Sequence, residues 1–278
     1  MFLKKALMTT RRIGRSMSDF PNPNLVRTDF KNGIKQITMT DPKTRNSLSV
    51  AMMETLIEHI KKDEHNPELR VIVLSGEGPA FSGGHNLKEL ASNKTQQEAC
   101  FTSAYKLMNT LIDSPVPIIA KVDGIAAAAG CQLVAQCDIS ICSDQSKFST
   151  PGANFGLFCS TPGVALARSI NKMPALYMLF TGLPISAEEA KSFGLVSKVY
   201  SGDQLDDEVG VICETIKAKS RDVIELGKRF YYKQVECDVR KAYQLGCEKM
   251  LENLQIGDCR EGIRSFIEKR KPQWGANN

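Results

Sequence analysis

The stretch that decides the fold is a pair of turns rich in small residues, AFSGGHNLKEL at residues 80–90 and VDGIAAAAGCQL at residues 122–133. Each turn follows a short apolar run, at residues 71–74 and 118–122, and leads into a helix-compatible stretch. Small side chains let backbone N–H groups approach a ligand closely. Two such groups that converge form an oxyanion hole, which stabilises negative charge on an acyl oxygen. The pattern therefore predicts repeated strand–turn–helix units with a site for an acyl oxygen between two turns.

The rest of the chain extends this alternation of strands and helices. Apolar runs between turn signals predict further strands, at residues 25–30, 34–39, 139–142 and 195–199. Helical spacing predicts helices, at residues 46–62, around 101–111, and at 203–219, 222–235, 238–255 and 259–270. Strands that alternate with helices and then give way to helices alone indicate an α/β core with a helical C-terminal region. We place the core at residues 19–200 and the helical region at residues 201–278.

The net charge of +5 resides entirely in the first 18 residues, which hold five Lys or Arg and no acid. The rest of the chain is balanced, so it offers no electrostatic surface for nucleic acid. Its apolar runs are too short for a membrane span. A basic, acid-free and amphipathic leader has the composition of a mitochondrial transit peptide, which predicts a location in the mitochondrial matrix. The alternative is a disordered basic tail.

Nine cysteines occur without a C-x-x-C pair, and most of them lie in apolar settings. This pattern favours buried free thiols over disulfides or a zinc site, and with three histidines we expect no metal. The sequence GEGPAF at residues 76–81 fails as a dinucleotide fingerprint, because Phe81 takes the place of the third glycine. His59 and His65 lie on or beside a polar helix face and are expected at the surface.

Taken in order, these segments resemble the crotonase (enoyl-CoA hydratase/isomerase) superfamily over about residues 25–274. The resemblance rests on RNSL at residues 45–48, on the two turns, on KFSTPGANFGLFCSTPG at residues 147–163, and on residues 180–196 and 261–274. It implies a crotonase-type α/β fold, a spiral of ββα turns with a C-terminal helical oligomerisation region that packs into homotrimers or hexamers. It also implies a bent acyl-CoA ligand and no separate cofactor, because coenzyme A enters as part of the ligand.

The resemblance also assigns site residues. It places the oxyanion-hole N–H groups at His85 and Ala129, where Ala129 serves if its φ is negative. It further implies contacts to coenzyme A from Arg45, Ser47, Lys88, Phe266 and Lys269, the last two reaching a neighbouring subunit's ligand.

The departures from the family pattern concern its acid–base groups. Gln132 stands where hydratases carry one glutamate, and Gly152, after Pro151, stands where they carry the second. Ser160 replaces the aspartate of dienoyl-CoA isomerases. A positioned acid or base contributes about 10²–10⁴ in rate, more than the retained hole offsets, so we expect weak or absent hydration. Glutamate at both positions would restore part of it if the backbone after Pro151 tolerates a side chain.

Two interpretations remain open at this point. Gln132 either hydrogen-bonds a thioester or water, or simply packs in its helix, and the His85 side chain either contacts the thioester or caps its loop. The sequence accordingly predicts an acyl-CoA-binding protein with a role in fatty-acid metabolism. The alternatives are a non-catalytic regulatory binder and an enzyme that decarboxylates, isomerises or hydrolyses a thioester with the help of His85.

Overall fold

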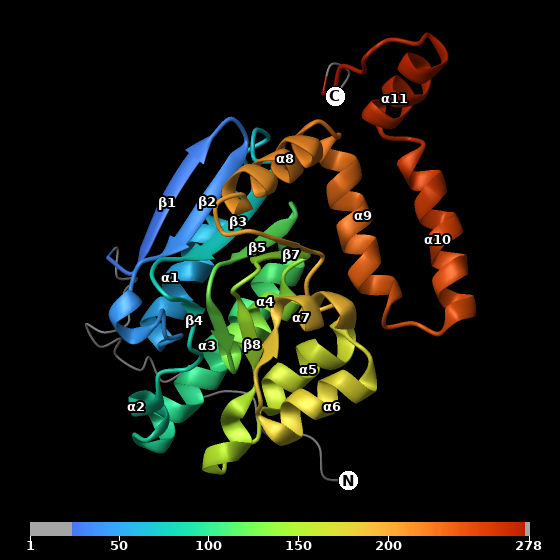
Figure 1. The fold of residues 1–278 in the computed structure, drawn as a ribbon. Coiled ribbons are helices and arrows are strands. Elements are labelled where there is room, and N and C mark those ends of the chain that lie inside the picture. The colour runs from blue at the N-terminus through green and yellow to red at the C-terminus, as the bar shows by residue number, and fades with distance from the viewer. Residues whose placement is uncertain (1–23, 276–278) are drawn as a thin grey trace, which may run out of the picture.

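The computed structural model describes residues 24–275, so the predicted leader at residues 1–18 lies outside the described chain. Six strands form the larger sheet in the order β1-β2-β3-β5-β7-β10 (Figure 1). Their bounds are β1 Val26–Lys31, β2 Ile34–Met39, β3 Val71–Gly76, β5 Ile118–Val122, β7 Ile139–Ser143 and β10 Lys198–Tyr200. β1 and β2 form an antiparallel hairpin, and every later neighbour in the sheet is parallel.

A second sheet consists of four short strands in the order β4-β6-β8-β9. Their bounds are β4 Ala80–Ser82, β6 Ile125–Ala127, β8 Lys147–Ser149 and β9 Ile185–Ser186. β3, β5 and β7 of the larger sheet each lead through a few residues into β4, β6 and β8 of the smaller one, and a helix follows each time. The chain thus winds as a spiral of ββα turns, which confirms the predicted fold. Since β4, β6 and β8 pair in parallel, the turns that follow them meet at one edge.

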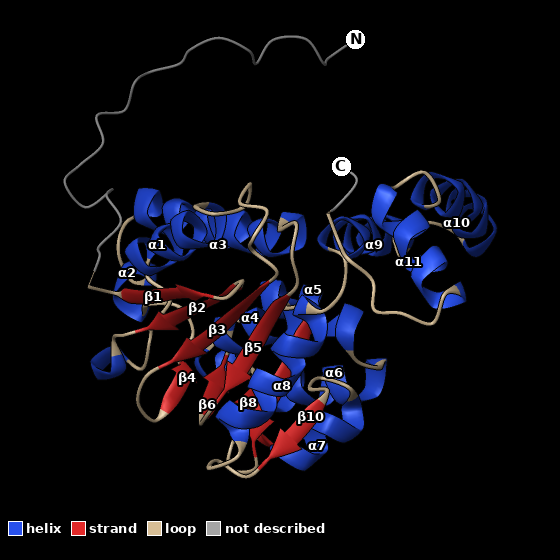
Figure 2. Ribbon diagram, turned by 90° about the horizontal axis from the view of Figure 1, so that it is seen from above, coloured by secondary structure: helices blue, strands red, loops and turns tan. Residues whose placement is uncertain are grey.

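Helices cover both faces of the larger sheet (Figure 2). α1 (Val50–Lys61) and α3 (Lys94–Asp113) lie over one face, and α8 (Leu205–Lys217) packs on the other. In β3, Ile72 joins the core beneath α1 and α3, while its neighbour Val73 packs with the core cluster that includes Val209 of α8. A strand buried on both faces needs a continuous apolar run, which explains the sequence VIVL.

The remaining helices complete the spiral and the C-terminal region. They are α2 Leu87–Leu90, α4 Ala129–Gln136, α5 Ser160–Ser169, α6 Lys172–Thr181, α7 Ala187–Phe193, α9 Arg221–Gln234, α10 Val239–Asn253, α11 Gly257–Ile267, and the 3₁₀ helices Pro42–Thr44 and Pro151–Phe155. Among residues 24–275, no helix is long and apolar enough to cross a membrane.

The structure confirms the long predicted elements and corrects several of their ends. α1 begins at Val50 rather than at residue 46, because Ser49 caps it by accepting the Met52 N–H at 3.1 Å. The strand predicted at residues 195–199 begins at Lys198. The four strands of the smaller sheet were not predicted from periodicity. They have only two or three residues each and form through partners distant in the sequence.

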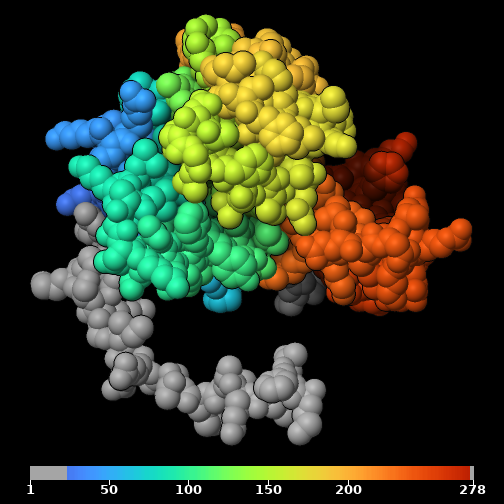
Figure 3. Space-filling view, turned by 90° about the horizontal axis from the view of Figure 1, so that it is seen from below, coloured from blue at the N-terminus to red at the C-terminus, as the bar shows by residue number. Residues whose placement is uncertain are grey.

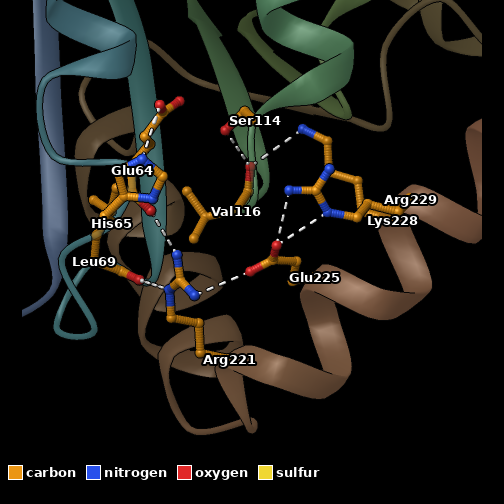
Figure 4. Close-up of polar contacts among 9 residues, drawn as sticks. All are labelled: Glu64, His65, Leu69, Ser114, Val116, Arg221, Glu225, Lys228 and Arg229. Atoms are coloured by element: carbon orange, nitrogen blue, oxygen red, sulfur yellow. Dashed lines mark hydrogen bonds and ion pairs between the residues drawn. The ribbon is translucent and has the colours of Figure 1, made fainter. Parts of the chain in front are cut away.

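The predicted helical region begins at residue 201, yet its first helix, α8, is part of the core packing. α9 and α10 project to one side of the sheets as an antiparallel pair, and α10 returns so that α11 lies beside the N-terminal end of α9 (Figures 1 and 3). The N-terminal end of α9 is held to the core by hydrogen bonds of Arg221 (Figure 4). Arg221 donates to the carbonyl oxygens of Glu64 at 2.8 Å and Leu69 at 3.2 Å. A guanidinium holds several acceptors at once, so these bonds fix the direction in which α9 leaves the core.

Two turns further along α9, Lys228 is buried against the core. Its ammonium group donates to Asp138 at 2.7 Å and to the carbonyl oxygens of Leu111 and Val116 (Figure 4 shows the bond to Val116). The other oxygen of Asp138 accepts the hydroxyl of Tyr232 at 3.0 Å. Burial lowers the pKa of Lys228, while the charge of Asp138 opposes that shift. The carboxylate and the ammonium group therefore depend on each other, since either one alone would be a buried unpaired charge.

We predict that Lys228→Ala lowers the free energy of unfolding by about 3 kcal/mol, because it leaves the Asp138 carboxylate buried without its cation. Urea unfolding followed by circular dichroism measures this. Lys94→Ala is the matched control, since Lys94 pairs with Glu98 at 3.7 Å on the surface and should contribute little. Equal stability of the two variants would contradict the prediction.

Candidate functional site

The site predicted between the two turns exists because the turns touch. β4 and β6 are parallel neighbours, so the residues that follow them emerge side by side. A Cβ placed on Gly130 would lie 2.3 Å from the carbonyl oxygen of Ser82. A Cβ on Gly84, whose φ is +91°, would lie 2.9 Å from the Ala127 oxygen and 3.1 Å from the Ala129 nitrogen. Both glycines are required by this close approach of backbone to backbone.

The two predicted donors meet at this contact. Ala129 is the first residue of α4, where a helical N–H has no partner within its own helix. His85 follows Gly84 directly in the other turn. Within residues 24–275, no hydrogen bond takes up the backbone N–H of either His85 or Ala129. Two free amides presented by adjacent turns are the arrangement that polarises a carbonyl oxygen.

The backbone at the second turn is strained. Ala128 has φ 51° and ψ −118°, a region that residues with a Cβ rarely occupy. Ala129 is not among the residues with positive φ, so the condition set for it as a donor is met. The Ala128 N–H is held by the Ser149 oxygen at 2.9 Å, and its own oxygen accepts the Gln132 N–H at 3.0 Å. These two bonds keep the strained peptide in place and orient the next N–H, that of Ala129.

The loop before α1 holds the first turn in place through hydrogen bonds. Asn46 is completely buried, and its amide group donates to the oxygens of Glu77 and Ala80 and accepts the Asp41 N–H. The hydroxyl of Ser82 donates to the Asn46 oxygen at 2.8 Å and accepts the Gly84 N–H at 3.2 Å. This chain of bonds positions the residue before the His85 donor. The supporting role of the Asn46 side chain was missed in the sequence, because its partners are 31 and 34 positions away.

Arg45, Ser47 and Lys88 gather around the same turn. The Gly83 N–H donates to the Arg45 oxygen at 2.8 Å, and the Leu48 N–H donates to the Gly84 oxygen at 2.8 Å. The side chains of Arg45 and Lys88 are exposed, and Ser47 is half-buried. The three residues therefore lie at or beside the first turn, and the charged side chains of Arg45 and Lys88 are exposed to solvent.

Phe266 and Lys269 are not brought to this site. Phe266 is 83% exposed on α11, and Lys269 follows that helix, far from α2 and α4 (Figure 1). A role for them toward a neighbouring subunit's ligand stays a prediction.

The His85 side chain points toward α3. Its Nδ1 lies 3.3 Å from the Leu48 oxygen and 3.6 Å from the Cys100 sulfur, and its ring meets Phe101 edge to face at 5.6 Å. Since the Leu48 oxygen can only accept, we assign the ring proton to Nδ1. Nε2 is buried and has no partner among the described residues. Burial lowers the pKa of His85 more than the bond to Leu48 raises it. These contacts favour the loop-capping interpretation.

The two positions where hydratases carry glutamates, 132 and 152, differ in the room they leave for a side chain. Gln132 is 6% exposed on α4, and its Oε1 has no partner among the described residues. At Gly152 a Cβ would lie 2.0 Å from the Leu157 oxygen and 2.8 Å from the Cys159 sulfur. The condition for restoring hydration with two glutamates is therefore not met, because the backbone has closed over position 152. Ser160 is exposed at the start of α5.

The structure also describes the cysteines, the two other histidines and a second cleft. All nine cysteines are free, as predicted, and burial raises the pKa of the Cys100 thiol to about 11. Residues 24–275 contain no group of three or more His, Cys, Asp or Glu side chains arranged to hold a metal ion. His65 is exposed as predicted, whereas His59 is half-buried and its Nδ1 has no partner in the described chain, so that prediction was wrong. A cleft of about 550 Å³ between α9 and α11 includes Arg260 and Arg264 and lies away from the two turns.

The fold and the paired amides place the chain in a known family. The model of the enoyl-CoA hydratase/isomerase family matches residues 29–277, and the chain belongs to this family.

Among its relatives, the chain is similar to the mitochondrial enoyl-CoA hydratase domain-containing protein 3 of mouse and human. Both are 48% identical to it, over 91% of this chain and 85% of the mouse protein, and over 94% of this chain and 86% of the human protein. The crystal structure of the human protein superposes with a TM-score of 0.88 and covers 90% of this chain and all of that one. An enoyl-CoA hydratase of Mycobacterium smegmatis superposes with a TM-score of 0.87 at 39% identity, covering 90% of this chain and 98% of that one.

We predict that His85 makes the protein less stable in acid. Because its folded pKa is below the ordinary 6.5, the unfolded chain binds the proton more readily, so the free energy of unfolding falls as the pH drops below 6.5. His85→Gln should flatten this decline when unfolding is measured from about pH 7.5 to about pH 5. His65→Gln, at a histidine that is 94% exposed, is the control. An equally steep decline in both variants would contradict the prediction.

We also predict that Ala128→Gly raises the free energy of unfolding by about 1 kcal/mol, because glycine adopts the observed φ and ψ without strain. Ala135→Gly, in the same helix that Ala128 caps, should instead lower it by about 1 kcal/mol through helix propensity. Chemical unfolding of the two variants beside the wild type tests the opposite signs. A loss of stability at both positions would show that Ala128 is unstrained.

Proposed function

We propose that this protein binds acyl-CoA thioesters and polarises their carbonyl group, with a role in fatty-acid metabolism in mitochondria. The observation that carries this proposal is the pair of free backbone amides, of His85 and Ala129, on two turns in contact. A thioester oxygen that accepts both N–H groups gains partial negative charge, and each donor of this kind contributes about 10²–10³ to a rate.

Carbonyl polarisation and proton transfer depend on different groups of the protein, the first on backbone amides and the second on acid–base side chains. Hydration of a double bond needs one group to activate water and another to protonate carbon, and each such group contributes about 10²–10⁴. An uncharged amide at Gln132 cannot exchange a proton near neutral pH, and Gly152 has neither a side chain nor room for one. Hydration of an enoyl thioester should therefore be weak or absent, while binding persists.

Contacts to the coenzyme A moiety are proposed from the surface around the first turn. Arg45 and Lys88 place two positive charges beside the hole, where they match phosphate groups. Phe266 and Lys269 would complete the site from a neighbouring subunit of a homotrimer or hexamer. The projecting helices support such an assembly, because Tyr243 on α10 and Phe266 and Ile267 on α11 are 76%, 83% and 73% exposed. Large exposed apolar side chains of this kind mark interaction surfaces.

The mitochondrial location is proposed from two independent indications. The mouse and human relatives carry "mitochondrial" in their names, and residues 1–18 have the composition of a transit peptide.

The second candidate is an enzyme that acts on an acyl-CoA enolate or thioester through His85. It is favoured by a neutral imidazole beside the hole, whose Nε2 is buried without a partner in the described chain. The contacts of the ring with Leu48, Cys100 and Phe101 favour binding without catalysis instead.

We predict that Ala129→Pro weakens binding of butyryl-CoA about tenfold, because proline removes the N–H that one carbonyl bond requires. Proline is tolerated at the first residue of a helix, so α4 should persist. Isothermal titration calorimetry measures the affinity, and free butyrate should bind far more weakly than the thioester.

Ala187→Pro is the matched control, since Ala187 is the first residue of α7 and lies outside the proposed site. It should bind as the wild type does. Mass spectrometry of a panel of acyl-CoA thioesters after incubation with the protein distinguishes the two candidates. Turnover that His85→Ala abolishes would establish the enzyme, and failure of the wild type to bind any thioester at millimolar concentration would overturn the proposal.

A further inference from the structure

The outer side of β1 is an exposed edge of the larger sheet. β1 stands first in the strand order, and among the described strands it pairs with β2 alone. All of its residues except Val26 are exposed, and it lies on the opposite side of the molecule from α10 and α11 (Figure 1). The edge of a strand presents N–H and C=O groups that another strand can take up. β1 therefore offers a place where a further strand can join the sheet.

The turn of the β1–β2 hairpin decides which residues of β1 face this edge. Lys31 pairs with Ile34, and the two residues between them have φ values of 51° and 79°, as in a type I′ turn. A two-residue turn of this kind is closed by a hydrogen-bonded pair, here Lys31 and Ile34. Since hydrogen-bonded and non-hydrogen-bonded positions alternate along antiparallel strands, the odd-numbered residues of β1 bond to β2. The even-numbered residues therefore direct their backbone groups outward.

The outward residues are Val26, Thr28 and Phe30. Within residues 24–275, no hydrogen bond outside the sheet takes up their backbone N–H or C=O groups. The side chain of Val26 is 4% exposed, whereas that of Phe30 is 38% exposed on the same face of the strand. The edge thus carries three free pairs of backbone groups and one apolar side chain that solvent reaches.

The other face of β1 carries side chains of alternating charge. Arg27, Asp29 and Lys31 lie on this face, because successive side chains of a strand point to opposite sides. Arg27 pairs with Glu77 at 2.5 Å in an exposed contact that contributes little to stability. Asp29 has no ion pair within residues 24–275. Charges on an edge strand normally discourage pairing with another strand, so their order decides which partner the edge accepts.

This order fits an antiparallel copy of β1 in one register. With a two-fold axis at Thr28, Arg27 lies opposite Asp29 of the partner subunit, and the partner's Phe30 lies opposite Val26. The outward groups of both strands meet only if the register moves in steps of two residues. One step one way places Arg27 opposite its own copy, and one step the other way places Asp29 opposite its own copy. Opposite charges across strands stabilise a pair and like charges destabilise it, so the charges select the register centred on Thr28.

We propose that β1 pairs antiparallel with β1 of a second copy of this chain, across a two-fold axis at Thr28. The pairing makes about six backbone hydrogen bonds and joins the larger sheets of two subunits into one. The Arg27 guanidinium has five N–H donors, so it can hold Glu77 and the partner's Asp29 together. Because β1 lies away from α10 and α11, this interface is separate from any assembly through those helices, and it does not depend on thioester binding.

The first test removes backbone bonds at the axis and measures the mass of the full chain by sedimentation equilibrium. The wild type should contain an even number of chains. Thr28→Pro should halve that mass, because it removes the N–H group that both strands use at the axis and weakens the pairing about tenfold or more. The hairpin should persist, since this N–H does not bond β2 and edge strands tolerate proline. Thr28→Val keeps the N–H group and is the matched control, which should retain the wild-type mass.

The second test reverses the charges. Asp29→Lys places positive charges opposite each other, and Arg27→Glu places negative charges there, so each variant alone should show half the wild-type mass. An equal mixture of the two variants should regain the full mass, because every facing pair is then opposite in charge. Lys31→Glu is the control, since Lys31 lies beyond the facing charges in this register, and it should keep the wild-type mass.

The results separate this interface from other occupants of the edge and from the proposed function. A wild-type mass of an odd number of chains, or one that Thr28→Pro and both charge variants leave unchanged, would overturn the inference. A mixture that fails to regain the full mass would also overturn it, because a purely structural effect of the two changes is not rescued by mixing. Thr28→Pro should bind butyryl-CoA as the wild type does in calorimetry, so the proposed function stands or falls by its own test.

Discussion

The structure depends on one contact, the approach of the backbone at residues 82–85 to the backbone at residues 127–130. No side chain fits between them, since a Cβ on Gly130 would lie 2.3 Å from the Ser82 oxygen. This contact requires parallel pairing of β4 with β6, which in turn requires the chain to return to the larger sheet between them. The spiral and the paired amides are thus consequences of the same constraint.

Rigid elements on every side hold this contact. Asn46 links the loop before α1 to Glu77, which follows β3, and to Ala80 of β4, and the Ser149 oxygen of β8 accepts the Ala128 N–H. Strain at Ala128 persists because its neighbours leave it no alternative, which is how unfavourable backbone angles survive at functional sites. The site is therefore arranged before any ligand arrives, and preorganised donors act without reorganisation when charge develops.

The same scaffold shows how a family changes its chemistry while keeping its fold. Backbone donors do not depend on side-chain identity, so an alanine at position 129 can present its N–H group. Acid–base groups do depend on it, and the chain has an amide at Gln132 and a closed backbone at Gly152. What remains at the two turns is a pair of backbone amides with neutral polar neighbours. Within residues 24–275, the buried atoms Thr150 Oγ1 and Gln132 Oε1 have no hydrogen-bond partner.

The sequence by itself determined the order of the longer strands and helices, the two turns, the family and the two positions, His85 and Ala129, whose backbone N–H groups have no partner within residues 24–275. These features depend on local spacing, such as VIVL before a glycine turn, and on the identity of small residues, which are visible in the chain. The tertiary structure alone decided the four strands of the smaller sheet, the direction of the His85 ring and the closure at Gly152. It also decided that Thr150 Oγ1 has no partner within residues 24–275. Each of these depends on atoms from other turns of the spiral: the Leu48 oxygen and Cys100 for His85, the Leu157 oxygen for Gly152, and the pairing of β6 with β8 for Thr150. Periodicity and composition carry no information on such contacts, because they arise only when segments distant in the sequence are packed together.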